Sequence, residues 1–386
     1  MKRIISIIIA VTMVFSFSAC SFKKDDIKER KSAEPRINYE DNLRAVWLSY
    51  YEIGDIFSSL NENEAKEKLD EMFSFLSERG INTVFFHTRA FCDAFYFSDY
   101  FPLSSYSPKG YDLLKLAVSL AHKKRMSIHA WINPYRVALN KTISDVSENS
   151  PAIKLYNENK ENLISGEGFV FLNPASINAQ KLILDGIREI VENYDIDGIH
   201  FDDYFYPSQS VSLDKQLYAS YKKSGGTLSL EDYRRENVSA LISSVKTLIK
   251  GENKNIIFGI SPQASIEKNK SELFADVLEW INEGYVDYIM PQVYFGFKNE
   301  TSPFEETVLN WKELLKNKNV SLYCGLAKYK EGKTDEYASA DKQSETSPFF
   351  EWVNDEKIIE RQIDFLNANG IKGYSIYSYS DLLREN

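Results

Sequence analysis

Residues 197–204 read Asp-Gly-Ile-His-Phe-Asp-Asp-Tyr and follow a helical pattern of apolar residues over Ser176–Tyr194. Alternate side chains of a strand point to opposite faces of its sheet. The apolar Ile199 and Phe201 therefore share one face, and Asp202 lies on the other. A strand that is apolar toward its helices and polar only at its carboxyl end is typical of a parallel sheet covered by helices.

The same helix-and-strand unit recurs along the chain. We expect strands over Leu43–Tyr51, Ile81–Arg89, Met126–Asn133, Asp197–Tyr206, Ile256–Gln263, Asp287–Phe295, Val320–Tyr329 and Ile371–Ser380. We expect helices over Glu64–Arg79, Tyr111–Lys124, Ser176–Tyr194, Leu230–Lys250, Ser271–Asn282, Pro303–Lys316 and Lys357–Asn369. This order predicts a (β/α)8 TIM barrel in the α/β class, with a doubly wound sheet as the second choice. Because only Asp381–Asn386 follow the eighth strand, the last helix is expected to be short or missing, and another segment must cover that side.

Three long connections follow predicted strands, over Val137–Ala175, Pro207–Ser229 and Lys330–Glu356. In a barrel, the loops after the strands surround the active site. Long loops at this end therefore indicate a site for an extended ligand. The alternative is that they are variable surface segments with no role in binding.

The first 42 residues differ from the rest. Lys2 and Arg3 precede an apolar run that ends in Phe17-Ser18-Ala19-Cys20, which resembles a bacterial lipobox. We expect residues 1–19 to be a lipoprotein signal peptide, residues 20–42 a flexible tether, and residues 43–386 the barrel domain. Lipidation of Cys20 would anchor the exported protein to the outer face of the bacterial cell membrane. A plain secretory signal peptide is the alternative.

The composition excludes several classes of protein. Hydrophobic residues make up 43% and charged residues 26% of the 386 residues, as in ordinary globular proteins. The formal net charge of −10 argues against a nucleic-acid partner. Aromatic residues reach 14%; they can fill the core, or they can form flat platforms for carbohydrate. Cys92 and Cys324 could form a disulfide, but nothing in the sequence shows that they are close.

Polar and aromatic side chains gather where the predicted strands end, and there they can bind a substrate. Burying so many polar groups is costly unless they bind one another or a ligand. The candidate substrate-binding residues are Trp47, His87, Arg89, His129, Trp131, Asn133, Tyr135, Arg136, His200, Tyr204, Gln263, Gln292 and Tyr294.

Asp202 and Asp203 are the leading catalytic candidates, because two adjacent carboxyl groups at a strand end can raise each other's pKa. Glycoside hydrolysis needs one proton donor and one base or nucleophile. We expect Asp202 to be the nucleophile or base, with Asp203 or Asp93 as the acid. Asp203 could instead cap the next segment or pair with an arginine.

A metal site is a further alternative, since His87, His129 and His200 all fall near Asp202. Each histidine lies on a different strand, however, and the usual His-x-His and His-Glu-x-x-His spacings do not occur. We therefore expect no metal and no cofactor.

Several long motifs resemble the glycosyl-hydrolase-like-10 family of bacterial envelope lipoproteins. They are Arg44–Leu48, Asp93–Tyr96, His129–Val137, Leu172–Pro174, Tyr194–Pro207, Phe258–Pro262 and Asp287–Tyr294. The resemblance covers about Leu43 to Ser380. It implies a TIM-barrel, glycosidase-like enzyme with Asp202 and Asp203 in its active site and cell-wall glycan as substrate.

Together these features predict a glycoside hydrolase that cleaves O-glycosidic bonds of an extracellular polysaccharide such as peptidoglycan glycan, by carboxylate acid/base chemistry. The expected partners are this glycan and the membrane, through the lipid anchor. A non-catalytic glycan-binding lipoprotein is the main alternative, because the sixth predicted strand carries Gln292 rather than an acid. A metal-dependent hydrolase is the third.

Overall fold

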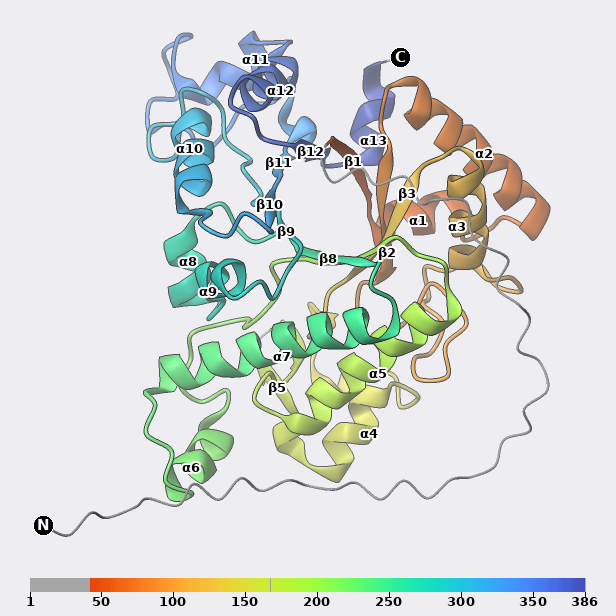
Figure 1. Ribbon diagram of the computed structural model, residues 1–386, viewed down its shortest axis with the longest axis vertical. Helices are drawn as coiled ribbons and strands as arrows, with labels where there is room; N and C mark the ends of the chain where they lie inside the picture. The colour runs from red at the N-terminus through yellow and green to blue at the C-terminus, as the bar shows by residue number, and fades with distance from the viewer. Residues whose placement is uncertain (1–41, 167, 386) are drawn as a thin grey trace, which may run out of the picture. The chain divides into compact units, whose positions relative to one another are not determined.

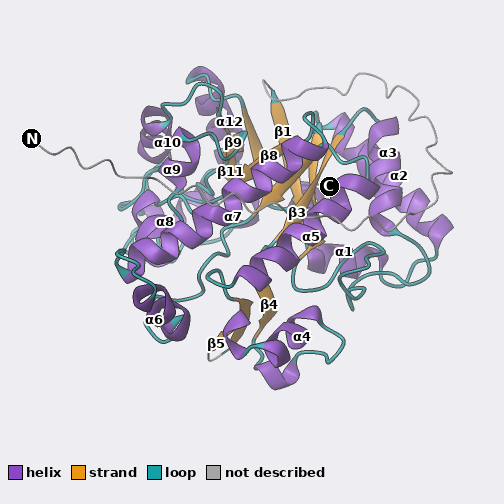
Figure 2. Cartoon of the chain, turned by 60° about the horizontal axis from the view of Figure 1, so that its bottom comes forward, coloured by secondary structure: helices purple, strands orange, loops and turns teal. Residues whose placement is uncertain are grey.

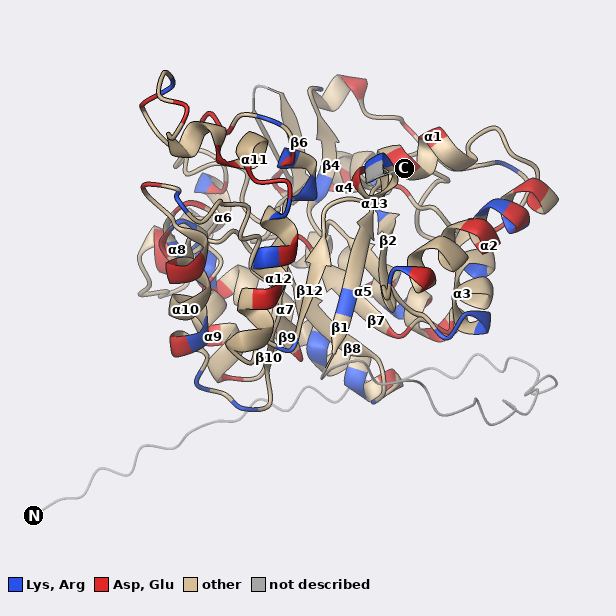
Figure 3. Ribbon diagram, turned by 90° about the horizontal axis from the view of Figure 1, so that it is seen from above, with Lys and Arg blue, Asp and Glu red and all other residues tan. Residues whose placement is uncertain are grey.

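The computed structural model describes residues 42–166 and 168–385. The expected signal peptide, Cys20 and nearly all of the expected tether lie outside this described part. Helices surround a set of parallel strands (Figure 1). Charged residues lie mostly on the helices and loops around these strands (Figure 3).

The main sheet has the strand order β10-β9-β8-β7-β3-β2-β1-β12-β11, and all of its pairs are parallel. Tyr323 separates β10 from β11. Strand β10 pairs with β9, and strand β11 pairs with β12. A bridge between Gln292 and Gly325 joins the two edges, so that the sheet is a nearly closed barrel with eight strand positions. The strands are β1 (Leu43–Leu48), β2 (Thr83–Arg89), β3 (Ser127–Ile132), β7 (Gly198–Phe201), β8 (Ile257–Ile260), β9 (Tyr288–Ile289), β10 (Ser321–Leu322), β11 (Cys324–Leu326) and β12 (Gly373–Ile376).

Helices follow most of these strands and cover their outer side (Figure 2). They are α1 (Tyr50–Phe57), α2 (Glu62–Glu78), α3 (Leu113–Lys123), α4 (Pro151–Glu158), α5 (Ile177–Asn193), α6 (Lys215–Lys223), α7 (Leu230–Glu252), α8 (Ile266–Glu272), α9 (Val277–Asn282), α10 (Phe304–Leu314), α11 (Glu351–Asn354), α12 (Ile358–Ala368) and α13 (Tyr379–Leu382). The predicted TIM barrel is thus confirmed, and the last helix, α13, is short.

The sequence sets the helix ends locally. Asn61 caps α2 by accepting from the backbone N–H of Glu64, whose carboxylate accepts from the backbone of Asn61. The helix is followed by Gly80 at a φ of 75°, a left-handed conformation that glycine adopts without a steric penalty. The chain then enters β2 within three residues, which keeps this connection short.

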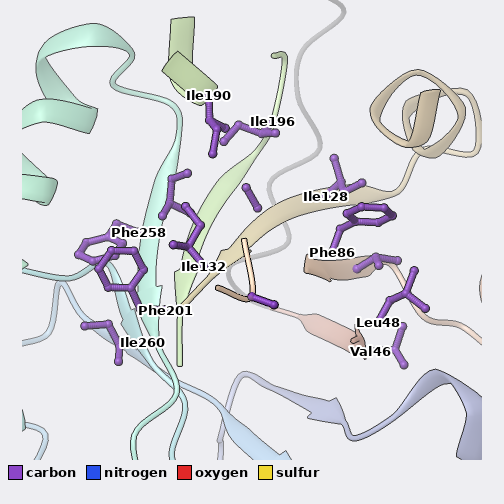
Figure 4. Close-up of a cluster of buried hydrophobic side chains, with 14 of the residues drawn as sticks. Val46, Leu48, Phe86, Ile128, Ile132, Ile190, Ile196, Phe201, Phe258 and Ile260 are labelled. Carbon is purple, nitrogen blue, oxygen red and sulfur yellow. The ribbon is translucent and has the colours of Figure 1, made fainter. Parts of the chain in front are cut away.

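The two faces of each strand pack against different parts of the molecule, one against the helices and one inside the barrel, as the alternation of side chains predicts. Between sheet and helices lie the apolar side chains of Figure 4, among them Val46, Phe86, Ile128, Phe201 and Phe258. The interior of the barrel holds a second cluster that contains Trp47, Phe85, Trp131, Tyr288, Met290 and Tyr323. Each fully buried apolar side chain contributes about 1.5–3 kcal/mol. The barrel interior is therefore a packed core, which also encloses His129 and His200.

Two predicted regions differ from the structure. The connection over residues 137–175 is not an irregular loop: it contains α4 and most of a three-stranded antiparallel sheet of β4 (Arg136–Leu139), β5 (Leu163–Gly166) and β6 (Phe169–Leu172). The helix expected over Ser271–Asn282 is instead divided into α8 and α9, because Phe274 takes a positive φ of 53° between them.

Candidate active site

Asp202 and Asp203 directly follow β7 at the carboxyl end of the barrel. Asp202 is 7% exposed and Asp203 is half-buried. The backbone N–H of Asp203 donates to Oδ1 of Asp202 at 2.7 Å, and the two carboxyl groups also interact with each other. Asp203 is thus close enough for its charge to act on Asp202.

Burial raises the pKa of Asp202 well above its usual range, and the charge of Asp203 raises it further. The positive charge of Arg136 acts in the opposite direction but is a smaller effect. Asp202 therefore keeps its proton to a higher pH than an exposed aspartic acid. A group of this kind is suited to donate a proton.

Gln292 lies beside Asp202 although it follows β9, which is separated from β7 by β8. Its side-chain amide donates to Oδ1 of Asp202 at 3.3 Å and to the backbone carbonyl of Ser261 at 2.9 Å. Gln263 forms a backbone bridge with Gln292, which brings both glutamines to this end. The strand that lacks an acid thus supplies a hydrogen-bond donor to the carboxyl pair.

Arg136 is the cation of the site. It is buried at the start of β4, and its guanidinium lies 4.2 Å from the ring centroid of Tyr204 and 4.7 Å from that of Phe91. It forms no ion pair with the described residues. The ring of Tyr204 is 38% exposed, so it forms the outer surface of this stack.

His87 and Trp131 stack on each other with ring centroids 3.7 Å apart and an interplanar angle of 15°. The backbone N–H of Tyr50 donates to Nδ1 of His87 at 3.2 Å. Burial lowers the pKa of His87 well below its usual value, and the charge of Arg136 lowers it further. The histidine is therefore neutral at neutral pH.

Three other candidates lie deeper, inside the barrel. Trp47 is only 2% exposed and donates its indole N–H to Nε2 of His200 at 3.2 Å. The hydroxyl of Tyr288 is 2.8 Å from Nδ1 of His200 and 3.2 Å from Nδ1 of His129. Burial lowers the pKa of His129 to about 4. These side chains form an interior network that supports the layer containing Asp202.

Tyr294 belongs to an aromatic group on the opposite side of the site. Its ring centroid is 6.3 Å from that of Tyr377, whose hydroxyl lies 2.9 Å from the hydroxyl of Tyr51. Burial raises the pKa of Tyr294, and Asp202 and Asp203 are among the charges that raise it further. Tyr294 therefore lies near both carboxyl groups.

The expected position of Arg89 is wrong. The register between β2 and β3 shifts after His87, so that Arg89 pairs with the outward-facing Ile132 instead of sharing a face with His87. The guanidinium lies 3.8 Å from the ring centroid of Phe101, and a methyl group at Gly186 of α5 would clash with it. A bulge in the strand thus turns this side chain toward the outer helices.

The remaining candidates have mainly local contacts. Asp93 interacts with the side chain of Ser104 and the backbone at Phe91, and no interaction with Asp202 or Asp203 is present among the described residues. Asn133 is fully buried and donates to the carbonyl of Ala90 at 3.2 Å. Tyr135 is also fully buried, and burial raises its pKa.

Sequence reasoning missed Glu52, which is 2% exposed. One of its carboxylate oxygens accepts from the backbone N–H and hydroxyl of Ser49 at 2.8 and 2.6 Å. The other accepts from the hydroxyl of Ser378 at 2.7 Å and the backbone N–H of Ser380 at 2.8 Å. It joins the segments after β1 and β12 and fixes Tyr51 near Tyr377. Only the capping pattern Ser49-x-x-Glu52 signals this residue in the sequence.

Three further features of the described residues concern metal ions, disulfides and membrane spans. They contain no group of three or more His, Cys, Asp or Glu side chains placed to hold a metal ion. Cys92 and Cys324 are buried free thiols and do not form a disulfide. Among the helices of this part of the chain, none has the length and apolar character that a membrane span requires.

The sequence profile of the family described as Glycosyl hydrolase-like 10 matches residues 42–342, which covers the barrel strands from β1 to β11 and the candidate site. The chain belongs to this family.

Two curated relatives are similar in sequence to this Glycosyl hydrolase-like 10 chain. It is 32% identical over 315 residues to glycosyl hydrolase YngK of Bacillus subtilis, covering 75% of this chain and 61% of that protein. It is 32% identical over 295 residues to glycosyl hydrolase DigH of Escherichia coli K12, covering 69% of this chain and 65% of the relative. The match thus spans less than two thirds of the length of either relative.

Solved structures share the barrel of this family member at low sequence identity. The PgaB (BpsB) glycoside hydrolase domain from Bordetella bronchiseptica superposes with a TM-score of 0.60 at 12% identity, covering 89% of this chain and 96% of that one. The catalytic domain of β-amylase from Paenibacillus polymyxa gives a TM-score of 0.57 at 9% identity, with coverages of 89% and 94%. At these identities the likeness establishes the fold.

Proposed function

We propose that this chain is a glycoside hydrolase that cleaves O-glycosidic bonds in an extracellular polysaccharide, with the glycan of the bacterial cell wall as its substrate. The observation that carries the proposal is the buried Asp202 with Asp203 next to it at the carboxyl end of the barrel, where Asp202 accepts a hydrogen bond from Gln292. Membership of a glycosyl hydrolase-like family supports the reaction class.

Asp202 acts as the general acid in this proposal. Breaking a glycosidic bond requires a proton on the leaving oxygen, and a carboxyl group with a raised pKa can supply it. Asp203 keeps that pKa high through its charge. This proposal differs from the expectation that Asp202 is the nucleophile or base and Asp203 or Asp93 the acid, because the raised pKa of Asp202 favours donation of a proton.

The geometry of the pair limits what it can do. Retaining glycosidases place their two carboxyl groups about 5 Å apart and inverting ones about 6.5–9.5 Å apart, on either side of the bond. Asp202 and Asp203 are adjacent and joined by a hydrogen bond from the backbone N–H of Asp203, so both lie on one side of the bond. Asp202 gives its proton to the leaving oxygen, water adds to the anomeric carbon of the sugar, and the carboxylate of Asp202 takes up the proton that this water releases. Asp93, the other expected acid, makes its contacts elsewhere.

The proposed location is the outer face of the cell membrane, with a lipid on Cys20. The small residues directly before this cysteine and the apolar run before them support it. An anchored barrel on a polar tether would be able to reach cell-wall glycan.

The test is to incubate the purified protein with intact sacculi and to detect soluble glycan fragments by chromatography and mass spectrometry. Wild type should release fragments and Asp202→Asn should not. The matched control is Asp185→Asn, which alters a surface carboxylate of α5 that pairs with Lys181 and should retain activity. Equal release by wild type and Asp202→Asn would contradict the assignment. Binding of sacculi without any release would favour a glycan-binding protein instead.

A further inference from the structure

The turns that lead from a helix into a barrel strand lie at the amino end of the barrel, because all pairs in the main sheet are parallel. Their basic residues are Arg79, Lys124, Arg125, Lys254, Lys316, Lys318 and Lys372, which we call the amino-end cluster. Their acidic residues are Asp195, Asp197, Glu283 and Asp287. Seven basic residues against four acidic ones reverse the balance of the whole chain, whose net charge is −10. This end of the barrel therefore differs in charge from the rest of the molecule.

Two of the four acidic residues are engaged within the fold. Asp287 forms ion pairs with Lys246 and Lys250, which both come from α7. Asp197 accepts from the backbone N–H of Ile128 at 2.8 Å. Their charges are thus already taken up by neighbouring groups, and the cluster leaves the surface at this end positive.

The lysines of the cluster are not explained by the helices before them. A helix favours cations at its carboxyl end, but this effect falls off within the last turn. Lys318 and Lys372 each lie four residues beyond the preceding helix. Lys254, Lys316 and Lys318 are exposed and form no ion pair within the part of the chain that the structure describes. Their side chains are therefore available to a negatively charged partner.

Two exposed aromatic side chains lie near the same end. Phe97 is 56% exposed and Tyr100 is 44% exposed. The hydroxyl of Tyr194, which follows the last residue of α5, donates to the carbonyl of Phe97 at 3.4 Å. Ser98 donates to Glu189 near the end of α5 at 2.5 Å, which holds this segment against the helix. Exposed aromatic rings together with basic side chains are typical of surfaces that bind at the lipid headgroups.

The chain enters the barrel at this end. Strand β1 begins at Leu43, so the expected tether over residues 20–42 joins the barrel beside the amino-end cluster. Asp202 and Asp203 follow β7 at the opposite end. A lipid on Cys20 would therefore tie the basic end, and not the end with the carboxyl pair, to the bilayer.

We propose that the amino-end cluster, with Phe97 and Tyr100 beside it, is a docking face for a membrane surface that contains anionic phospholipids. Each basic side chain close to such a surface adds to the attraction, so that a local cluster can bind it although the whole chain is negative. Docking of this face directs Asp202 away from the bilayer. The proposal goes beyond the glycosidase reaction and does not depend on it.

The test locates the face relative to a bilayer. The full-length protein, purified from the membrane of a bacterial host, is reconstituted on vesicles of phosphatidylcholine alone or with about 30% phosphatidylglycerol. A fluorophore is attached at Asn319→Cys in the turn before β10 or at Tyr337→Cys, an 88% exposed position in the loop after β11. The native Cys92 and Cys324 are buried and should not react with the dye. Lipids with a nitroxide headgroup quench any fluorophore that lies at the bilayer surface.

We expect phosphatidylglycerol to increase the quenching at position 319 several-fold and to leave position 337 unaffected. The increase should disappear in about 1 M salt, where charges are screened beyond about 3 Å. Attachment of the protein to phosphatidylcholine alone reports the lipid anchor, whereas the effect of phosphatidylglycerol reports the docking face. A failure of the proposed anchor and a failure of the docking face are therefore distinguishable, and neither depends on the release of glycan.

A triple variant tests the cluster itself, with the substitutions Lys254→Gln, Lys316→Gln and Lys318→Gln. It should lose most of the quenching that depends on phosphatidylglycerol. The matched control removes the same charge from three exposed lysines of α6, with the substitutions Lys215→Gln, Lys222→Gln and Lys223→Gln. The control should keep the quenching of the wild type, and thermal unfolding should show both triple variants to be folded.

Each result decides the question. Quenching that depends on phosphatidylglycerol at position 319, is lost in the amino-end variant and is kept in the α6 variant supports the docking face. Equal quenching at positions 319 and 337, or no effect of phosphatidylglycerol, would overturn the proposal. An amino-end variant that behaves like wild type would overturn it as well. An equal loss in the two triple variants would show that only the net charge matters, which also contradicts a defined face.

Discussion

The side-chain amide of Gln292 donates a hydrogen bond to Oδ1 of Asp202 at 3.3 Å across the end of the barrel. The two residues are 90 positions apart in the sequence and follow different strands. A donor to a carboxylate favours its charged form, which opposes the effect of burial on Asp202. The amide also holds the carboxyl group in one orientation, since it is itself fixed by the carbonyl of Ser261.

Replacing Gln292 with leucine removes this donor. The pKa of Asp202 should then rise, and the alkaline limb of the pH–rate profile on cell-wall glycan should move to higher pH. The maximal rate should fall by about tenfold because the acid is no longer held in place. Fragment release measured from pH 4 to about pH 10 would show both effects. An unchanged profile would mean that the amide does not influence the proton donor.

Replacing Asp203 with asparagine should have the opposite effect on pH dependence. The charge of Asp203 raises the pKa of Asp202, so its removal lowers that pKa. A general acid is active only while protonated, and activity should therefore be lost at a lower pH than in wild type. The same pH–rate series measures this shift. Movement of the limb toward alkaline pH would contradict the proposed relation between the two carboxyl groups.

Asp202→Asn should make the fold more stable at alkaline pH. The pKa of Asp202 is higher in the folded state than in the unfolded chain, where it is about 3.9. The wild-type protein thus loses stability as the pH rises from this value through the folded pKa, because burial disfavours the charged form. Asparagine does not ionise, so the variant should gain stability relative to wild type between pH 5 and about pH 9. Urea unfolding at both pH values provides the measurement, and a gain that does not depend on pH would argue against this cause.

Glu52→Gln should weaken the seam between the first and last strands. The carboxylate of Glu52 accepts four hydrogen bonds from Ser49, Ser378 and Ser380, two on each oxygen. In the glutamine variant, an NH2 group replaces one of these oxygens and cannot accept the two hydrogen bonds on that side. We expect a loss of about 2 kcal/mol in the free energy of unfolding. Hydrogen exchange should increase in the segment around Tyr377. If exchange rises evenly over the whole barrel instead, Glu52 has no local role at this seam.

Arg234→Met should destabilise the protein strongly. Arg234 and Asp214 are almost completely buried and form an ion pair at 2.7 Å, and Arg234 also holds the carbonyls of Gln209 and Ser210. Removing the cation leaves Asp214 charged and buried, which should cost about 3–5 kcal/mol. Chemical denaturation would measure the loss. The double variant Arg234→Met with Asp214→Leu should recover part of it, because no buried charge then remains unpaired.

Much of the barrel could be predicted from periodicity. The alternation of apolar runs with helical patterns located all eight strand positions. The alternation of side chains along β7 correctly predicted that Ile199 and Phe201 lie on one face of the strand and Asp202 on the other. These features are local, since they depend on which residues share a face. The strands themselves end earlier than expected, because the polar residues after them bend into the loops.

Long-range contacts and small irregularities could not be predicted. The bulge after His87 reverses the direction of Arg89, and no residue type marks it in the sequence. The hydrogen bonds of Glu52 depend on the meeting of the first and last strands. Arg136 reaches Asp202 only because a small antiparallel sheet follows β3.

By itself, the sequence determined the order of strands and helices and the identity of the acidic pair, because side-chain periodicity is fixed by backbone geometry. The tertiary structure decided which polar side chains surround that pair and which of them lie deeper in the barrel. The pairing of β7, β8 and β9 in the sheet brings Gln292 to Asp202, and burial there raises the pKa of the carboxyl group. The closeness of Gln292 to Asp202 and the removal of water from Asp202 both arise from packing between segments that are distant in the sequence. These two effects make the carboxyl pair a candidate for acid catalysis.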